Sequence, residues 1–451
     1  MRKALVTLWV ALVLCTSLPA ARAQSFRVPF TQFRLDNGLR VVMTVDNAAP
    51  VVAVAVYYDV GSRNEVRGRT GFAHLFEHMM FQGSENVGKG EHFKLVESNG
   101  GYLNGSTHID FTNYFEFLPS NQLELALWLE SERMRSLKIT PANLQNQKEA
   151  VKEEKRLSYD NQAYWPALEK MDEMVFHNWA NAHSTIGSMA DLDAATVGDV
   201  QQFFDTYYTP NNAVLAIAGD IDPAQAEAWV RKYFAGIPRR AAPPPVDVTE
   251  PAGVVEHKKV VDDPQADTPG VALAWKTPDR RDPDFYAIAL LKAILFDGDS
   301  SRLYQALVKR AAAALEVRGT LEERRGPGQL AVFVIHKAEV KSEAVLAIIE
   351  AEISRVKRDG ITPDELAKAK NQYRLGRFTC ENPIECTGLQ TALGRALELA
   401  EFTLFDGDPA LINSELDRYF AVNAAQVREA ARRLFVESNQ ATLFIRPAKP
   451  Q

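Results

Sequence analysis

The stretch "VVAVAVYYDVGS", residues 51 to 62, opens with a run of apolar and aromatic residues rich in valine, which predicts a buried β-strand. After a polar connection comes the helix-compatible "GFAHLFEHMMFQGS", residues 71 to 84. The same order returns later in the chain, where the strand-like "GVALAWKTPD" (270 to 279) precedes the helical "FYAIALLKAILFDG" (285 to 298). We therefore expect two copies of one unit built from strands and helices.

Further strands and helices are predicted to come in neighbouring pairs. Asn37-Gly38 predicts a tight hairpin, and the alternating "TNYFEFLP" (112 to 119) predicts another strand. An amphipathic helix is expected over 121 to 137, and Thr140-Pro141 begins a second helix that can continue to Asp160. The expected fold class is therefore α+β, with two homologous domains that each pack a largely antiparallel sheet with helices.

The chain is long enough for two domains, because single cores stop growing at about 250 to 300 residues and this chain has 451. The proline-rich "GIPRRAAPPPVDVTEPAG" (236 to 253) is typical of an extended linker. We expect an N-terminal domain at 24–235, a proline-rich linker at 236–256 and a homologous C-terminal domain at 257–451.

The first residues predict an export signal, with a basic start, an apolar run and small residues at Ala21 and Ala23. We expect a signal peptide at 1–23, cleaved after Ala23, and a periplasmic or secreted mature protein. No membrane span is expected after cleavage, since the apolar run is shorter than the roughly 20 residues that a span needs. Cys380 and Cys386 then remain, and the sequence leaves open whether they form a disulfide or stay separate thiols.

The charge balance excludes one class of partner. The formal net charge is −7, and it becomes −10 when the signal takes the positive charges of Arg2, Lys3 and Arg22 with it. The sequence has no basic cluster interleaved with aromatic residues, so nucleic acid is not an expected partner.

The motif "HLFEH" has the composition of a metal site. If residues 71 to 80 are helical, His74 and His78 lie on one face, where both rings can bind one zinc ion. Glu77 lies on the same side and can take a proton from a water that attacks a peptide bond. This is the inverted H-x-x-E-H order of one class of zinc hydrolases. The alternative is a hydrogen-bonded cluster without a metal.

Catalytic zinc needs a third protein ligand. The run "QNQKEAVKEEKRLSYD" offers Glu153 and Glu154, which lie about 100° apart on a helix, so only one of them can face the metal. The residues themselves do not decide between these two, or between a ligand and an ordinary solvated face.

Several spaced segments resemble the pitrilysin and mitochondrial processing peptidase superfamily of inverted-motif zinc peptidases, most closely its short bacterial two-domain members. They are "GRTGFAHLFEHMMFQGSENVGKGEHFKLVESNGGYLNGSTHIDFTNYFEFLP", "KEAVKEEKRLSYDN", "YYTPNNAVLAIAGDID" and, in the second part, "DGDSSRLYQALVKR". The resemblance implies a zinc-dependent endopeptidase with one zinc ion per chain that hydrolyses unfolded peptides. It also implies that the two domains form half of a clam-shell chamber.

Matched position by position, the resemblance implies that His74, His78 and Glu154 bind zinc and that Glu77 is the general base. Asn104 matches an asparagine at the sheet edge where peptides add as an extra strand, and a plain turn at 104 to 106 is the alternative. Gln147 stands where the family usually has a glutamate that supports the metal site, so we expect weaker metal affinity or altered acidity of the metal-bound water.

The C-terminal domain departs further from the pattern. After "SRL", active single-chain members carry an arginine and, seven residues on, a tyrosine that hold the substrate and the oxyanion; here these positions are Val308 and Leu315. Neither side chain can donate a hydrogen bond, so the isolated chain is expected to be a poor enzyme. Relatives that divide the two motifs between two chains imply a heterodimer, in which a homologous partner supplies the arginine and tyrosine. The alternative is a non-catalytic assembly or scaffold subunit of the same fold.

The other histidines have no partner at ligand spacing and are interpreted as ordinary polar residues; they are His92, His108, His177, His183, His257 and His336. The peptide substrate, the cleavage preference and the identity of the partner are left open by the sequence.

Overall fold

The structure is a computed structural model that describes residues 26–380 and 387–448. The expected signal peptide, its cleavage after Ala23, and Cys386 lie outside these residues. Cys380 lies within them and is disulfide-bonded. Among the described residues, no helix combines the length and the apolar composition needed to pass through a lipid bilayer.

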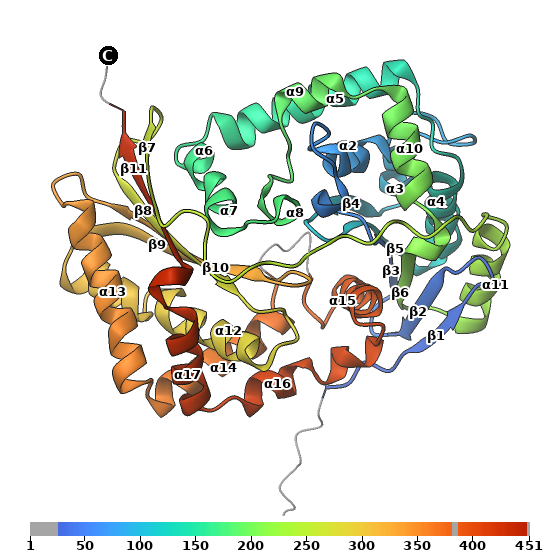
Figure 1. Cartoon of the computed structure of the whole chain (residues 1–451). Coiled ribbons are helices and arrows are strands. Elements are labelled where there is room, and N and C mark those ends of the chain that lie inside the picture. The colour runs from blue at the N-terminus through green and yellow to red at the C-terminus, as the bar shows by residue number, and fades with distance from the viewer. Residues whose placement is uncertain (1–25, 381–386, 449–451) are drawn as a thin grey trace, which may run out of the picture.

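Two β-sheets form the centres of the two halves of the molecule (Figure 1). The first sheet contains β1 (Thr31–Arg34), β2 (Arg40–Val45), β3 (Val51–Tyr58), β4 (Tyr102–Thr107), β5 (Thr112–Pro119) and β6 (Ala213–Gly219). The second contains β7 (Lys258–Asp263), β8 (Gly270–Thr277), β9 (Ala314–Glu322), β10 (Gly328–His336) and β11 (Gln440–Pro447).

The two sheets repeat one topology. The first has the order β1-β2-β6-β3-β5-β4 and the second the order β7-β11-β8-β10-β9. β2 pairs with β6 in parallel and β7 pairs with β11 in parallel, while the other pairs in both sheets are antiparallel. The prediction of two homologous, largely antiparallel α+β units is therefore confirmed, with β1 as an extra strand in the first.

The helices lie around these sheets. The first half of the chain contributes α2 (Phe72–Met79), α3 (Glu91–Ser98), α4 (Leu123–Ser136), α5 (Pro141–Lys155), α6 (Trp165–Leu168), α7 (Lys170–Val175), α8 (Trp179–Ala182), α9 (Met189–Ala194), α10 (Val197–Tyr207) and α11 (Pro223–Phe234). The second half contributes α12 (Pro283–Phe296), α13 (Ser342–Asp359), α14 (Pro363–Phe378), α15 (Ala392–Phe405), α16 (Glu415–Ala421) and α17 (Ala424–Leu434). Two π-helical segments extend helical turns, η3 (Arg156–Asp160) after α5 and η5 (Tyr304–Arg310) before β9.

β3 is buried on both faces, which explains its continuous apolar sequence. Successive side chains of a strand point to opposite faces, so Val54 and Val56 pack into the core under α2 and α4, together with Leu75 and Leu127. The opposite face of β3 carries Ala53, Ala55 and Tyr57. A second layer of apolar side chains must pack on this face to bury it.

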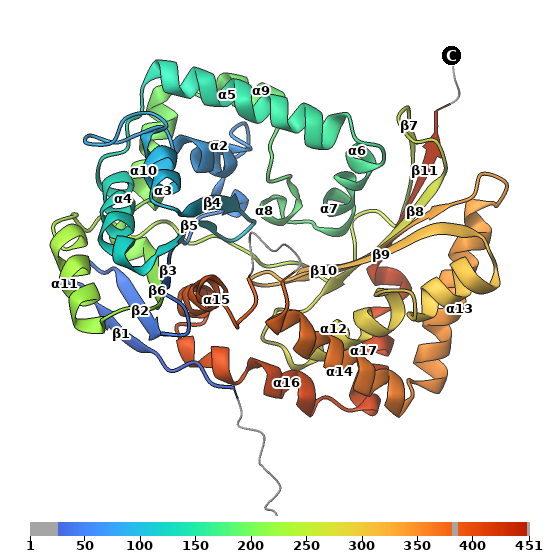
Figure 2. The same ribbon diagram turned by 180° about the vertical axis from the view of Figure 1, so that it is seen from behind.

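The two halves of the chain exchange helices to provide that cover. α15, from the second half, packs Leu393, Ala396 and Leu399 against the small side chains of Ala53 and Ala55 in the first sheet (Figure 2). In return α7, from the first half, packs Met171, Met174 and Val175 against Ala272, Ala274 and Leu443 of the second sheet. Alanines on these faces allow the helices to approach closely.

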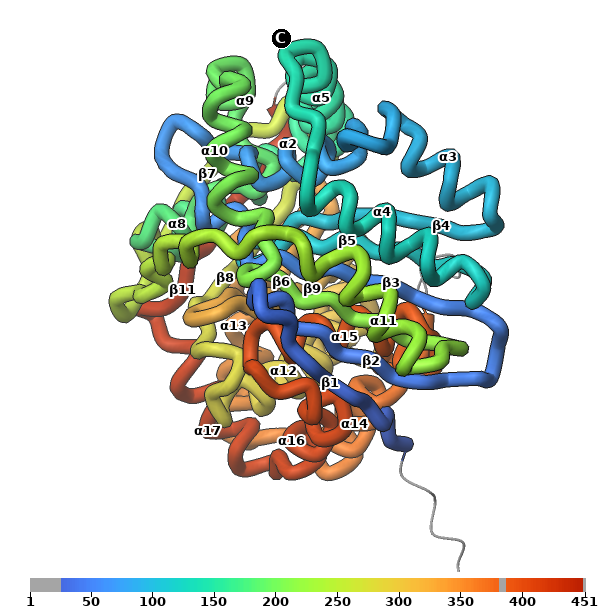
Figure 3. The backbone as a smooth tube through the Cα atoms, turned by 90° about the vertical axis from the view of Figure 1, so that its right-hand side faces the viewer, coloured from blue at the N-terminus to red at the C-terminus, as the bar shows by residue number. Residues whose placement is uncertain are grey.

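Residues 236–256 contain neither helix nor strand and connect α11 of the first half to β7 of the second (Figure 3). The proline-rich segment thus leads the chain from the first sheet to the second, and α15 later returns to cover the first sheet.

Candidate metal centre

Three predicted ligands converge at the junction of α2 and α5. Gly71, in the left-handed region with φ of 79°, precedes α2, and the next turns of this helix carry His74 and His78, whose rings lie 4.8 Å apart. Glu154 Oε2, from the last turn of α5, lies 3.2 Å from His78 Nε2 and 3.6 Å from His74 Nε2. One ligand atom from each of the three residues lies within 4.8 Å of the other two.

This spacing fits a metal ion of zinc's size. With bonds of 2.0 to 2.1 Å, the ligand atoms of a tetrahedral zinc are separated by about 3.3 Å. The two distances from Glu154 bracket that value. Two imidazoles and one carboxylate also form a donor set that zinc uses in hydrolases, with a fourth position left for water.

The path of α5 selects Glu154 over its neighbour. Thr140 caps the helix by accepting a hydrogen bond from the backbone N–H of Asn143, with Pro141 in the first turn, as the sequence predicts. Glu153 faces away from α2, and its exposed carboxylate pairs with Arg156 at 2.9 Å. The packing of α5 against α2 therefore places Glu154, and not Glu153, beside the two histidines.

Burial and hydrogen bonds within the cluster set the protonation of its members. Burial, and then the neighbouring His78, lower the pKa of His74 to about 4, so its ring is neutral at pH 7. Burial also lowers the pKa of His78, but the hydrogen bonds that it makes with Glu154 and Gln147 and the charge of Glu77 outweigh burial and raise the pKa overall. The hydrogen bond with His78 lowers the pKa of Glu154.

Gln147 reaches the site from α5, two turns before Glu154. It hydrogen-bonds His78, and its Nε2 donates to Asn146 Oδ1 at 2.9 Å. An amide in this place orients the ring of His78 without adding a charge.

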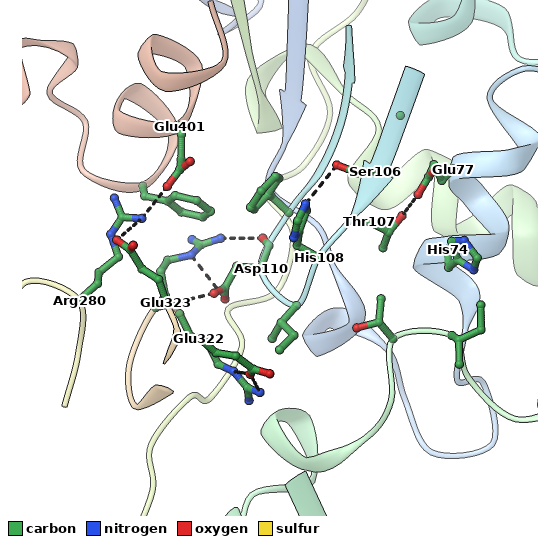
Figure 4. A pocket seen from close by; sticks show the side chains of 18 of the residues that line it. His74, Glu77, Ser106, Thr107, His108, Asp110, Arg280, Glu322, Glu323 and Glu401 are labelled. Carbon is green, nitrogen blue, oxygen red and sulfur yellow. Dashed lines mark hydrogen bonds and ion pairs between the residues drawn. The ribbon is translucent and has the colours of Figure 1, made fainter. Parts of the chain in front are cut away.

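Glu77 lies on the wall of a cavity of about 710 Å³ between the two halves of the molecule (Figure 4). Its Oε2 accepts a hydrogen bond of 2.6 Å from Thr107 Oγ1, and burial raises the pKa of the carboxyl group. Residues of the first half that line the cavity are His74, Glu77, Gly105, Ser106, Thr107, His108, Ile109, Asp110, Phe111, Glu154, Tyr159, Thr185 and Ile186. The second half adds Arg280, Glu322, Glu323, Arg324, Arg325, Glu401 and Phe405.

The wall opposite the metal cluster consists of ion-paired arginines that join the two halves. Arg325 pairs with Asp59, and its backbone N–H donates to Asp110 Oδ2 at 2.8 Å. Arg63 also pairs with Asp110 and donates to the backbone carbonyl of Arg325. Sequence reasoning missed this wall, because the run of two glutamates and two arginines at 322 to 325 is typical of a solvated turn.

The sequence also did not predict the position of His108. The sequence indicates an ordinary polar residue, but His108 directly follows β4, is exposed, lines the cavity and stacks on Phe111. Its Nε2 lies 3.1 Å from Ser106 Oγ. The alternation of the strand carried a usable signal, since Ser106 and His108 lie on one face and Gly105 and Thr107 on the other.

Asn104 lies on β4, which forms one end of the first sheet and pairs only with β5 among the described strands. It is exposed, accepts a hydrogen bond from the backbone N–H of Gly105, and lines an adjoining cavity of about 470 Å³. The two cavities share Gly105, Ser106, His108, Phe111 and Glu401, so they follow the same stretch of chain.

Val308 and Leu315 line neither of these cavities. Val308, in η5, packs against the core of the second half, and Leu315, at the start of β9, is 54% exposed. The C-terminal half therefore brings no hydrogen-bond donor to the metal cluster from these two positions.

Comparison with known proteins identifies the family. Residues 40–187 match the family model described as insulinase (peptidase family M16), and residues 194–373 match the model described as the peptidase M16 inactive domain. The chain belongs to peptidase family M16. The first match contains β2 to β5, and the second runs from β6 of the first sheet to β10 of the second.

The relatives of this M16 chain include proteins named as zinc proteases. It is 28% identical over 441 residues to zinc protease PqqE of Helicobacter pylori, covering 96% of this chain and 97% of the relative. A solved protease from Helicobacter pylori superposes with a TM-score of 0.86 at 26% identity, over 94% of this chain and all of the other. A solved peptidase M16 inactive domain from Pseudomonas fluorescens has the same fold, with a TM-score of 0.83 at 18% identity, over 94% of this chain and 99% of that one. As a member of family M16, the chain is therefore similar to zinc proteases. Its relatives include a domain described as inactive, so membership does not decide whether this chain is active.

Proposed function

We propose that this chain is the zinc-binding subunit of an exported metalloendopeptidase that hydrolyses unfolded peptides. The observation that carries the proposal is the convergence of His74, His78 and Glu154 beside Glu77, next to one large cavity whose wall includes His74, Glu77 and Glu154. The similarity to zinc proteases over nearly the whole chain supports it.

His74, His78 and Glu154 would hold one zinc ion, which polarises the scissile carbonyl and acidifies the attacking water. Glu77 would take the proton of that water and pass it to the leaving amine. Burial raises the pKa of the Glu77 carboxyl group towards neutral pH. A pKa closer to the working pH helps one group both to accept and to donate a proton. A peptide would add as a strand to the outer edge of β4, near Asn104, with main-chain hydrogen bonds that depend little on sequence.

The second part of the proposal is a heterodimer. Val308 and Leu315 leave the chain without the donors that hold the oxyanion, and a missing donor typically costs about 100- to 1000-fold in rate. Arg280, Arg324 and Arg325 do line the cavity, but each is engaged by a carboxylate of the same chain. A homologous partner chain that carries an arginine and a tyrosine would complete the site.

Peptide hydrolysis measured with and without the homologous partner tests both parts. We expect zinc-dependent hydrolysis by the pair, a loss of at least about 100-fold in Glu77→Gln, and loss of zinc in Glu154→Gln. Glu153→Gln is the matched control, because it removes the exposed neighbouring carboxylate and is expected to keep both zinc and activity. Full activity of the isolated chain would exclude the divided site.

The alternative is a non-catalytic assembly subunit of the same fold. It is favoured by the match of residues 194–373 to a domain described as inactive, and by the identities of Val308, Leu315 and Gln147. Metal analysis of the purified chain separates the two functions: stoichiometric zinc that is lost in His78→Ala supports the peptidase, and a metal-free chain supports the scaffold.

A further inference from the structure

Glu77 and Thr107 come from different elements and meet on the wall of the cavity. Oγ1 of Thr107, the last residue of β4, lies 2.6 Å from Oε2 of Glu77 in α2, and Figure 4 draws this contact. The distance is in the range of strong hydrogen bonds from a hydroxyl to a carboxylate. Within the described part of the chain, no other residue hydrogen-bonds the Glu77 carboxylate.

The direction of this hydrogen bond follows from the two acceptors that Thr107 can reach. Its hydroxyl lies 2.6 Å from Glu77 Oε2 and 3.5 Å from the backbone carbonyl oxygen of Ala73. An ionised carboxylate and a backbone carbonyl can only accept hydrogen bonds, so Thr107 is the donor. Its single hydroxyl proton points to the nearer acceptor, Glu77 Oε2. Oε1 of Glu77 is then left without a hydrogen-bond partner among the described residues, on a side chain that lines the cavity.

β4 also holds the stem of Glu77. A methyl group added at Gly105 would lie 3.2 Å from Glu77 Cγ, so the backbone of the strand runs directly against this side chain. Thr107 follows two residues later on the same face, and it is fixed in register opposite Thr112 of β5. Because threonine is branched at Cβ, its side chain has few rotamers, and its hydroxyl stays aimed at Glu77.

We propose that Thr107 is a positioning residue: it anchors one oxygen of Glu77 so that the other faces the reacting water. This inference rests on the proposed function. β4 is also the strand that would receive the peptide, so one strand would set the position of both the base and the scissile bond. An error of about 1 Å in such an alignment can cost about 100-fold in rate.

Kinetics of the zinc-loaded heterodimer test the role. Thr107→Val keeps the shape but removes the hydroxyl, and we expect kcat to fall about 10- to 100-fold with KM changed less than about twofold. Thr107→Ser restores the hydroxyl and is expected to recover most of kcat. Thr112→Val is the matched control: its buried hydroxyl donates to the Val60 carbonyl at 2.9 Å, so its loss should lower stability and leave kcat intact. An unchanged kcat in Thr107→Val, or a Thr107→Ser enzyme as slow as Thr107→Val, would overturn the inference.

Crystal structures of the two Thr107 variants give a readout that does not depend on hydrolysis. We expect the carboxylate of Glu77 to move by more than about 1 Å in Thr107→Val and to keep its place in Thr107→Ser. If the wild-type pair binds zinc but hydrolyses no peptide, the proposed function fails, and these structures still decide the role of Thr107. A Glu77 side chain that stays in place without the hydroxyl contradicts the anchor.

Discussion

Glu116 and His92 form a buried pair whose titration should be visible in the stability of the protein. Glu116, in β5, is fully buried, and His92, in α3, is 4% exposed. Glu116 Oε1 lies 2.5 Å from His92 Nε2. Burial raises the pKa of Glu116 to about 8, and burial lowers the pKa of His92 to about 3. At neutral pH both groups are therefore uncharged, with the carboxylic acid donating its proton to the ring nitrogen.

The change to test is Glu116→Gln, which keeps a hydrogen-bond donor but removes the titration. The pKa of Glu116 is about 8 in the folded protein and near 4.5 when it is unperturbed. Its contribution to stability is thus complete below pH 4.5 and is lost as the pH rises towards 8. The loss is about 1.4 kcal/mol per pH unit, or about 3 kcal/mol between pH 5 and pH 7.

His92 contributes in the opposite sense. Its pKa is lowered from 6.5, so its contribution is complete above pH 6.5 and is lost as the pH falls towards 3. Taking the difference between variant and wild type removes this contribution, because both proteins keep the histidine.

Urea unfolding at pH 5, 6 and 7 measures that difference. We expect the free energy of unfolding of Glu116→Gln, relative to that of the wild type, to increase by about 1.4 kcal/mol for each unit that the pH rises. Glu153→Gln, at a carboxylate that is 57% exposed, is the control and should differ from the wild type by less than about 1 kcal/mol at every pH. Parallel pH curves for Glu116→Gln and wild type would refute the reasoning, since they would show that Glu116 is ionised in the folded protein.

Three further outcomes are expected. Ala312 has a φ of 48°, so Ala312→Gly should raise the free energy of unfolding by up to about 1 kcal/mol in urea unfolding; a loss would contradict backbone strain there. Arg63, 2% exposed, pairs with Asp110 beside Arg325, so Arg63→Met should lower the same free energy by about 3 kcal/mol, and an unchanged midpoint would exclude this role. Removing zinc with a chelator should lower the melting temperature of the wild type, and His78→Ala should show no such shift if the metal is bound where proposed.

Local signals in the sequence predicted many of the elements. Asn37-Gly38 marks the turn between β1 and β2, where Gly38 has a φ of 98° that other residues rarely adopt. Thr140 and Pro141 mark the start of α5, whose continuation to Asp160 is completed by the π-helical η3. These features depend on a few neighbouring residues, so they can be found without knowing the rest of the fold.

The candidate site was predicted in part. The spacing of His74 and His78 places both rings on one helix face, and the structure brings them together as expected. The choice of Glu154 over Glu153 came from resemblance and not from spacing, because the rotation of α5 about its axis depends on its packing against α2. Thr107 and His108 reach the cavity only through the pairing of β4 with β5.

The sequence by itself determined the two repeated units, their elements and the two histidines with their glutamate, because these follow from the periodicity of adjacent residues. The tertiary structure alone decided that α15 covers the first sheet and α7 the second, and that Arg325 of the second half pairs with Asp59 of the first. Such contacts join residues far apart in the sequence, and their partners are chosen by shape and charge once the sheets have formed. Local patterns carry no information about that choice.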